Sequence, residues 1–312
     1  MNEAPGPVVV LAGGTGGAEL ARGMLDVVGA EHLVVIANTG DDIEIHGAHV
    51  SPDPDLITFW LADLIDERGW GLRGDTFATM DGLRALGADV WFNLGDRDLA
   101  IGLERARALR QGARVTDEQA RIAKALGVTA RVLPMSDLPV RTRILAGERW
   151  WPLQEFMIRR RGEGPVLDVD FRHARAAPPT PDALDALQSA RAIVIGPSNP
   201  IISIGPILAL PGMREAIASS AAPVVAVSPL VAGRVLKGPT AACMAWAGRP
   251  LTADGIAACY EGVIDGLVAD ELPRGLPALQ IDVLMGDAEA RRRLASATLE
   301  FALGLAPVHA GP

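Results

Sequence analysis

An uninterrupted apolar run at residues 8–11 opens the chain, and a glycine-rich turn follows it at once. A run of this kind is typical of a strand that is buried on both faces of a parallel sheet. Apolar residues then recur at helical spacing over residues 18–28, and a second buried-type strand covers residues 33–37. Strand, turn, helix and strand make a βαβ unit, which predicts a parallel sheet with helices packed on its faces.

The same alternation returns after residue 176 and continues toward the end of the chain. Between about residues 130 and 175 it is interrupted by short strands, which include a hairpin around Gly147. We therefore predict an α/β fold: a Rossmann-like, doubly wound, mostly parallel sheet with a small inserted α+β subdomain. Residues 1–130 and 176–312 form the core, and residues 131–175 form the insertion.

Several individual elements follow from local patterns. Thr116 and Gln119 have the spacing of a capping box at a helix start, and Thr180 or Asp182 can begin the helix after a proline-rich stretch. Helices are predicted over residues 55–66, 81–86, 98–110 and 116–126, and strands over residues 90–94, 132–134, 150–158 and 166–171.

Composition excludes several classes of protein. The 312 residues carry a net charge of −9, so no broad basic field is available for a nucleic acid or an anionic membrane. No apolar run approaches the ~18 residues of a membrane span. Cys243 and Cys259 have no Cys or His at metal-ligand spacing, which excludes a disulfide framework or zinc ribbon. We expect a cytoplasmic protein that holds any phosphate locally. Independently of composition, we expect a homodimer.

The glycine turn is the first candidate for phosphate binding, because backbone amides at a helix N-terminus attract anions. It lacks the Lys-Ser/Thr pair of a P-loop, and Glu19 replaces the last glycine of a dinucleotide fingerprint. A purely structural turn is the alternative. The predicted nucleotide contacts here are Gly13, Gly14, Thr15, Gly16 and Gly17.

Carboxylates cluster after the second strand. Asp41, Asp42, Asp53 and Asp55 fall within fifteen residues, and hard oxygen ligands of this kind suit Mg²⁺. The alternative is that Asp42 and Asp53 are turn or cap residues. His46 and His49 have no third His or Cys nearby, which favours hydrogen bonding over metal binding.

Two further loops follow predicted strands. The turn Gly95, Asp96, Arg97, Asp98 can clamp an anion through Arg97, or it is simply a capped helix start. The proline-stiffened loop after residue 195 can present hydroxyls and amides to a ligand; its members include Ser198, Asn199, Pro200 and Ser203. The arginines at 159–161 are interpreted as solvated charges, and most of the six tryptophans as core residues.

Taken in order, these blocks resemble the 2-phospho-L-lactate transferases of coenzyme F420 biosynthesis. The resemblance extends from the first strand past residue 240. It rests on Gly13-Gly14-Thr15-Gly16-Gly17, Asn38-Thr39-Gly40-Asp41-Asp42, His46-Gly47, Pro52-Asp53-Pro54-Asp55, Asp75-Thr76-Phe77, Gly95-Asp96-Arg97-Asp98, Gln154-Glu155, Gly196-Pro197-Ser198-Asn199-Pro200, Ser203-Ile204-Gly205-Pro206, Val227-Ser228-Pro229 and Lys237-Gly238.

The resemblance implies a Mg²⁺-dependent transfer in which the ribityl hydroxyl of the deazaflavin Fo attacks a phosphorus of a guanosine diphosphate-linked three-carbon acid. GMP leaves, and F420-0 or its dehydro form is the product. By this resemblance Asp41 and Asp55 are the catalytic, metal-binding aspartates, with Asp55 preferred to Asp53. The resemblance also implies that the core binds the nucleotide of the donor through the glycine turn together with Ser198, Asn199, Pro200 and Ser203, and that the insertion lies near the acceptor site. Acceptor contacts are expected from Asp55, Asn93, Gly95, Asp96 and Arg97, and Asn93 stands where some members have a lysine.

Two rival functions remain open. A related family of gluconeogenesis-type regulators shares the glycine turn and binds a nucleotide sugar without known chemistry, but the Gly95-Asp96-Arg97-Asp98 and Gln154-Glu155 blocks favour the transferase. A nicotinamide oxidoreductase would place Asp41 or Asp42 on a ribose, and Glu19 counts against it.

Overall fold

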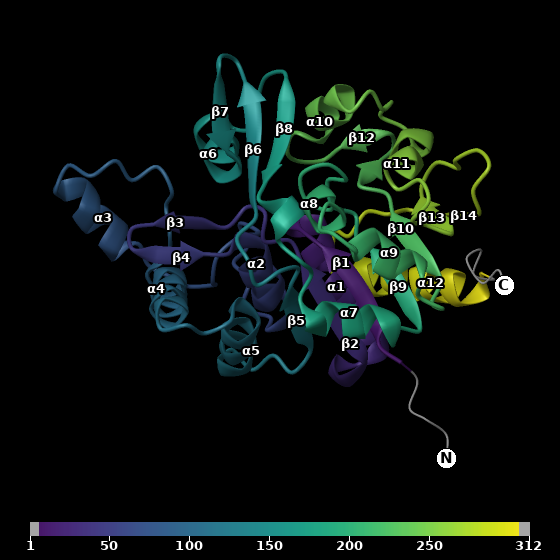
Figure 1. The fold of residues 1–312 in the computed structure, drawn as a ribbon, viewed down its shortest axis with the longest axis horizontal. Coiled ribbons are helices and arrows are strands. Elements are labelled where there is room, and N and C mark those ends of the chain that lie inside the picture. The colour runs from purple at the N-terminus through teal and green to yellow at the C-terminus, as the bar shows by residue number, and fades with distance from the viewer. Residues whose placement is uncertain (1–5, 306–312) are drawn as a thin grey trace.

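The computed structural model describes residues 6–305, and its centre is a seven-stranded parallel sheet (Figure 1). The strand order is β14-β13-β10-β9-β1-β2-β5. The predicted doubly wound α/β core is confirmed; the ends of the predicted core at 1–5 and 306–312 lie outside the described residues. The strands are β1 (Val8–Ala12), β2 (Leu33–Ala37), β5 (Arg131–Pro134), β9 (Ala192–Ile195), β10 (Val224–Val227), β13 (Gly266–Ala269) and β14 (Ala278–Gln280).

Helices cover both faces of this sheet, because alternate residues of each strand point to opposite sides. Val8 and Val10 pack with α1 (Gly14–Val28), α2 (Pro52–Leu61) and α12 (Ala288–Gly304). Val9 and Leu11 pack on the other side. The helices that contribute to that second core are α7 (Pro181–Gln188), α8 (Gly205–Leu208), α9 (Met213–Ala218), α10 (Thr240–Trp246) and α11 (Ala253–Cys259).

The order of the strands reverses at β1. From β1 the chain proceeds through β2 to β5 at one edge, and it then returns to place β9 on the other side of β1. Ligands of such sheets bind at the carboxyl ends of the strands where the order reverses. The loops after β1 and β9 therefore meet at the expected position of a site.

Two smaller units flank the carboxyl edge of the sheet (Figure 1). One holds the β3 (Ile43–Ile45) and β4 (Ala48–Val50) hairpin, α3 (Ala78–Ala85) and α4 (Asp96–Arg110), whereas α5 (Val115–Ala125) packs on the main sheet beside β5. The other is a three-stranded antiparallel sheet of β6 (Arg141–Ala146), β7 (Arg149–Pro152) and β8 (Asp168–Arg172) with α6 (Leu153–Arg159). A short hairpin, β11 (Leu230–Val231) and β12 (Arg234–Val235), follows β10.

Several predicted elements are wrong in detail. Residues 131–134 were assigned to the insertion, but they form β5 and pair with β2 in the main sheet. Residues 90–94 form no strand, since they pair with none of the described sheets, and their apolar side chains pack in a small cluster with β3, β4, α3 and α4. Residues 153–158 are helical instead of extended, and α2 ends at Leu61 instead of 66. Thr116 is not an N-cap, whereas Thr180 is, with its side chain accepting from the Ala183 amide.

Candidate functional site

A cavity of about 520 Å³ opens at the carboxyl edge of the sheet. Its walls come from α2, from the 90–98 segment and from α6 of the insertion. Trp70, Trp91, Phe92 and Phe59 make an aromatic lining, and aspartates supply most of its charge. The cavity combines flat apolar surfaces with a few convergent polar groups, as ligand sites generally do.

Asp41 is the most unusual of the lining residues. Its Oδ1 is buried without a hydrogen-bond partner, while its Oδ2 accepts a hydrogen bond of 2.9 Å from Gln154 Nε2. Burial, together with the negative charges of Asp53 and Asp42, raises the pKa of Asp41 well above its ordinary value. An unsatisfied buried carboxylate oxygen is costly, and a bound cation would relieve that cost.

Asp53 lies beside Asp41 and is held by two donors. Its Oδ1 accepts from the Gly14 amide at 2.6 Å, and its Oδ2 accepts from Asn38 Nδ2 at 2.9 Å. Burial raises the pKa of Asp53 to about 6 despite these donors. The two neighbouring carboxylates fit a divalent cation, because they repel each other when both are charged.

Asp55 has a different environment from the one the resemblance implies. Its Oδ2 accepts from Arg105 Nη1 at 2.9 Å, and its Oδ1 pairs with Arg105 Nη2. Arg105 is fully buried and also donates to Gln119 and to the His49 carbonyl. Bidentate pairing occupies both oxygens of Asp55. The structure therefore brings Asp53 against Asp41, whereas Asp55 is paired with a buried guanidinium.

The glycine turn and the loop after β9 lie against each other. The Gly13 amide donates to Ser198 Oγ at 3.2 Å, and a Cβ on Gly16 would lie 2.4 Å from the Pro197 carbonyl oxygen. Gly14, Thr15 and Ser203 line the cavity. Gly13, Gly16, Gly17, Ser198, Asn199 and Pro200 do not line it.

Asn199 has a structural task in its own loop. Its Oδ1 accepts from the amides of Ile201 and Ile202, and its Nδ2 donates to Thr240. The glycines of the turn are needed for close packing, since a Cβ on Gly17 would lie 2.7 Å from Ser198 Oγ. These residues shape the two loops. The residues of the two loops that line the cavity with a hydroxyl side chain are Thr15 and Ser203.

Of the residues predicted to contact the acceptor in this segment, one lines the cavity and the others hold the start of α4. Asn93 lines the cavity, whereas Gly95, Asp96 and Arg97 do not. Asp96 accepts hydrogen bonds from Thr76, Ala78 and Thr79, which lowers its pKa and ties α3 to α4. Gly95 is required because a Cβ there would lie 2.2 Å from Asp75, which accepts from the amides of Arg97 and Asp98. The alternative of a capped helix start describes this turn better than an anion clamp.

Sequence reasoning missed three cavity residues of chemical interest. Asn38 orients Asp53, Gln154 reaches Asp41 from the insertion, and Asp98 faces the cavity from the first turn of α4. All three lie in blocks that carried the resemblance, so their positions were available without their contacts. His49, a predicted hydrogen-bonding residue, does pair with Asp42 and Glu44.

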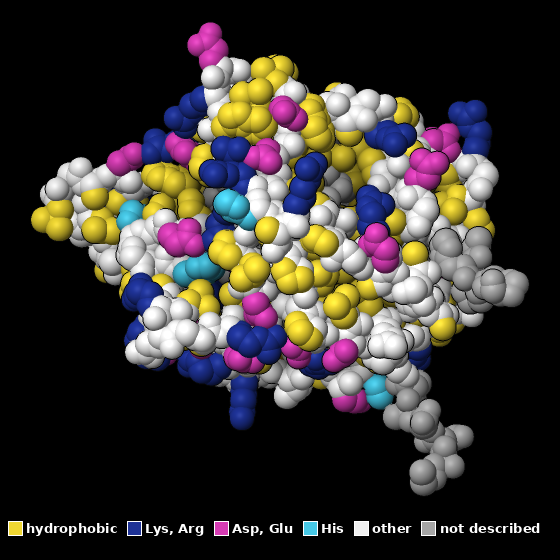
Figure 2. Space-filling model, viewed as in Figure 1, with side chains coloured by type: hydrophobic (Ala, Val, Ile, Leu, Met, Phe, Trp, Pro, Cys, Tyr) yellow, Lys and Arg dark blue, Asp and Glu magenta, His cyan; other side chains and the backbone are white. Residues whose placement is uncertain are grey.

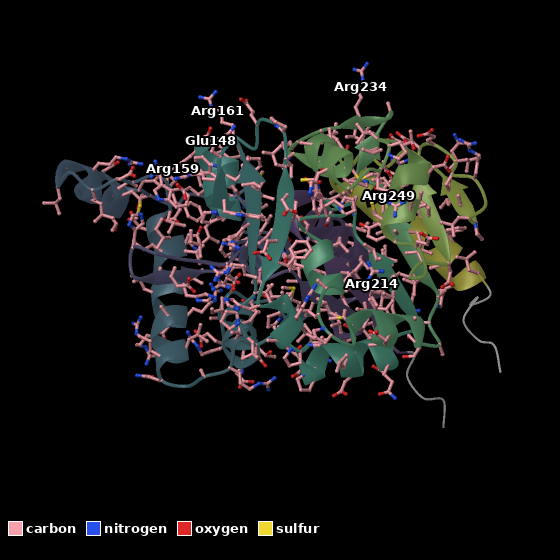
Figure 3. The ribbon with its side chains drawn as sticks, turned by 45° about the horizontal axis from the view of Figure 1, so that its top comes forward. Glu148, Arg159, Arg161, Arg214, Arg234 and Arg249 are labelled. Carbon is pink, nitrogen blue, oxygen red and sulfur yellow. The ribbon has the colours of Figure 1, made fainter. Side chains whose placement is uncertain are left out.

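The arginines at 159–161 lie outside the cavity. Arg159 pairs with Asp89 and with Glu155, and in Figure 3 Arg161 points away from the molecule, as does Arg234. Positive and negative side chains are interspersed over the face in Figure 2. None of the helices in residues 6–305 is long and apolar enough to cross a membrane. In that same part of the chain no group of three or more His, Cys, Asp or Glu side chains is arranged to hold a metal ion.

Known proteins of similar sequence match nearly the whole chain. The family model described as 2-phospho-L-lactate transferase CofD matches residues 8–284. A 2-phospho-L-lactate transferase of Methanosarcina mazei is 37% identical over 303 residues, which is 94% of this chain and 99% of the relative. A phosphoenolpyruvate transferase of Kitasatospora aureofaciens is 35% identical over 312 residues, covering 95% of this chain and 97% of the relative.

A crystal structure of a UPF0052 family protein from Bacillus halodurans has a similar fold, with a TM-score of 0.61 at 17% identity. It covers 96% of this chain and 100% of that one. At this identity the likeness shows the fold alone. The family model, which matches residues 8–284, and the relative that is 37% identical show that the chain belongs to the CofD family of 2-phospho-L-lactate transferases.

Proposed function

We propose that this protein transfers a 2-phospholactyl or phosphoenolpyruvyl group from a guanosine diphosphate-linked donor to the ribityl hydroxyl of the deazaflavin Fo. GMP is released, and F420-0 or dehydro-F420-0 is formed. The observation that carries the proposal is the partnerless Oδ1 of Asp41 beside Asp53, in a cavity that also has an aromatic wall. One cavity thus offers a place for a cation with its phosphates and a place for a flat ring.

Asp41 and Asp53 are the residues that would hold Mg²⁺, and we propose this pair in place of Asp41 and Asp55. A bound Mg²⁺ supplies charge neutralisation for the diphosphate and for the oxygens of the transferring phosphorus. Two protein carboxylates are sufficient, because Mg²⁺ usually keeps waters and completes its shell with substrate phosphates. Asn38 and the Gly14 amide fix the Asp53 carboxylate, and Gln154 fixes Asp41.

The chain contributes mainly positioning to such a transfer. Thr15 and Ser203 face the cavity from the two loops at the sheet edge and would contact the donor. Trp91 and Phe92, stacked with ring centroids 5.6 Å apart, would contact the deazaflavin ring. The acceptor hydroxyl would then lie between these walls, facing the donor phosphorus.

The test is product mass after incubation with Fo, GTP, Mg²⁺, a partner guanylyltransferase and, in separate reactions, phospholactate, phosphoenolpyruvate or phosphoglycerate. We expect a deazaflavin product with one of the first two acids and none when the cation is chelated. Asp41→Asn should abolish the product while leaving the protein folded. Binding of a nucleotide sugar with no product from any acid would favour the regulator, and NAD(H) binding without Fo binding would favour the oxidoreductase.

The relatives favour a transferase over a nucleotide-sugar-binding regulator. The proteins of Methanosarcina and Kitasatospora that match nearly the whole chain are both described as transferases. The homodimer stays a proposal that light scattering of the purified protein would test.

A further inference from the structure

Asp98 is a cavity residue without a task in the transfer described above. It lies in the first turn of α4, where its amide donates to Asp75 at 3.1 Å. Its side chain lines the cavity together with Trp91, Phe92 and Asn93. No described residue donates a hydrogen bond to its carboxylate, although its neighbours Asp55 and Asp75 each accept at least two.

The charges around Asp98 leave it in need of a partner. Asp55 of α2 and Asp75, in the segment before α3, lie close enough for their carboxylates to act on it. Arg105, on its own helix, is the positive group nearby, but Asp55 occupies that guanidinium. Burial and these negative neighbours raise the pKa of Asp98 to about 7. A partly buried carboxylate without a donor is unfavourable unless a ligand supplies one.

Asp98 lies at a different part of the cavity from the proposed cation pair. Asp41 and Asp53 are held by Gln154, Asn38 and the Gly14 amide, whereas Asp98 lies in the first turn of α4 next to Asp75. A general base must lie within hydrogen-bond reach of the proton it removes. The reacting hydroxyl must approach the cation pair, so Asp98 is better placed for another part of the acceptor.

Asn93, which also lines the cavity, provides a side-chain amide that complements the carboxylate of Asp98. Its Oδ1 accepts a hydrogen bond of 2.6 Å from Arg84, which fixes the side-chain amide. No described residue accepts from its Nδ2. A fixed donor and a partnerless carboxylate therefore line the cavity beside Trp91 and Phe92, which suits a planar ring that presents a carbonyl next to an N–H.

We propose that Asp98 selects the acceptor by accepting a hydrogen bond from the imide N–H of its pyrimidine ring, while Asn93 Nδ2 donates to the neighbouring ring carbonyl. The ring lies along Trp91 and Phe92, and its polyol chain extends toward Asp41 and Asp53. This inference rests on the proposed function, because it assigns a contact to the acceptor of that reaction. Sites built to pair a substrate N–H discriminate strongly against analogues that lack it.

Fo fluorescence titration without donor tests the contact. We expect Asp98→Leu to weaken Fo binding by roughly 10- to 100-fold, the range for a lost charge-assisted hydrogen bond. In turnover the loss should fall on the KM for Fo more than on kcat. Glu104→Gln removes a negative charge from an exposed part of the same helix and should leave Fo binding unchanged.

An Fo analogue methylated at the imide nitrogen gives the second arm. It should bind the wild-type protein as weakly as Fo binds Asp98→Leu, and the variant should not distinguish the two ligands. Equal binding of Fo and the methylated analogue by the wild-type protein would overturn the proposal. If the wild-type protein binds no Fo at all, the proposed function itself is wrong, and the two failures are thus separable.

Asp98→Asn keeps the shape of the side chain and guards against misfolding of the leucine variant. The ratio of wild-type to Asp98→Asn affinity for Fo cancels any titration of the ligand. We expect this ratio to rise as pH increases through about 7, because Asp98 becomes charged in that range. A ratio that does not change between pH 5.5 and pH 8.5 would contradict a contact made by the carboxylate.

Discussion

Asp53 and Asp55 are two residues apart in the first turn of α2, and yet they face different neighbours. A helix turns about 100° per residue, so the two side chains leave its axis some 200° apart. Asp53 faces the glycine turn and Asp41, and Asp55 faces the core and Arg105. The resemblance could not separate them, because the direction of each depends on where the helix begins.

The two positions predict opposite phenotypes. Asp53→Asn should lose most activity and stay folded, because the cation pair loses one charge. Asp55→Asn should lower the free energy of unfolding by about 3 kcal/mol, since removing one partner leaves the buried Arg105 charge uncompensated. Urea denaturation and turnover of both variants check this. A stable but inactive Asp55→Asn would restore Asp55 to the chemistry, as the resemblance first implied.

His49 makes a pH-dependent contribution to stability. Burial alone would lower the pKa of His49, but hydrogen bonds to Asp42 and Glu44 outweigh burial and raise it to about 9. A raised pKa means that its stabilisation is complete below about pH 6.5 and is lost as pH rises through about 9.

We therefore expect His49→Gln to lower the free energy of unfolding by about 1–3 kcal/mol at pH 6 and by much less at pH 10. Denaturant titration of both proteins at the two pH values gives the comparison. An equal loss at pH 6 and pH 10 would show that the imidazolium charge does not matter.

Helix starts are predicted wrongly where a residue far away in the sequence supplies the cap that a local pattern suggests. The pattern around Thr116 predicted a capping box, but Asp137 accepts from both the amide and the hydroxyl of Thr116 at 2.8 Å. Gln119, the other half of the expected box, donates to Thr58 instead. A local pattern cannot reveal a cap supplied from beyond β5, whereas Thr180 caps α7 within its own turn and was predictable.

Asp137 should therefore stabilise the start of α5. We expect Asp137→Ala to lower the free energy of unfolding by about 1–2 kcal/mol, the usual cost of a lost cap. Asp117→Ala, in the same turn but with an exposed side chain and a long ion pair of 3.7 Å to Arg114, should change stability by less than about 0.5 kcal/mol. Urea unfolding of the two variants decides it, and equal effects would refute the cap.

For the whole molecule, the sheet and its helices were predictable because alternating apolar runs and glycine turns are local signals. The position of residues 131–134 in the main sheet was not, since a four-residue strand looks the same in either sheet. The convergence of the glycine turn and the loop after β9 followed from the rule on parallel strands. Gln154 and Asp98 line the cavity only because the two smaller units pack over the carboxyl edge of the sheet. No short sequence pattern predicts that packing.

A substitution at Gly16 tests whether the glycine turn and the loop after β9 bind the donor together. A valine side chain there would collide with the Pro197 carbonyl and push the loop after β9 away from α1. We expect Gly16→Val to weaken GDP binding by at least about 10-fold and to leave Fo binding nearly intact. Gly82→Val, at a glycine with open space around it, is the matched control. Loss of Fo binding with GDP binding preserved would mean that the two halves of the site are assigned the wrong way round.

The place of β1 between β2 and β9 has a consequence for biosynthesis. During translation, β1 and β2 emerge early, but residues 192–195 must be made before the second edge of β1 is covered. Until then a nascent chain presents the apolar strand Val8–Ala12 with unpaired backbone groups, which is a template for faulty association. The donor side of the cavity forms in the same late step, because the Gly13 amide meets Ser198 only after β9 has docked. A ribosome-bound chain that stops short of β9 should therefore lack the donor side of the cavity and leave one edge of β1 uncovered.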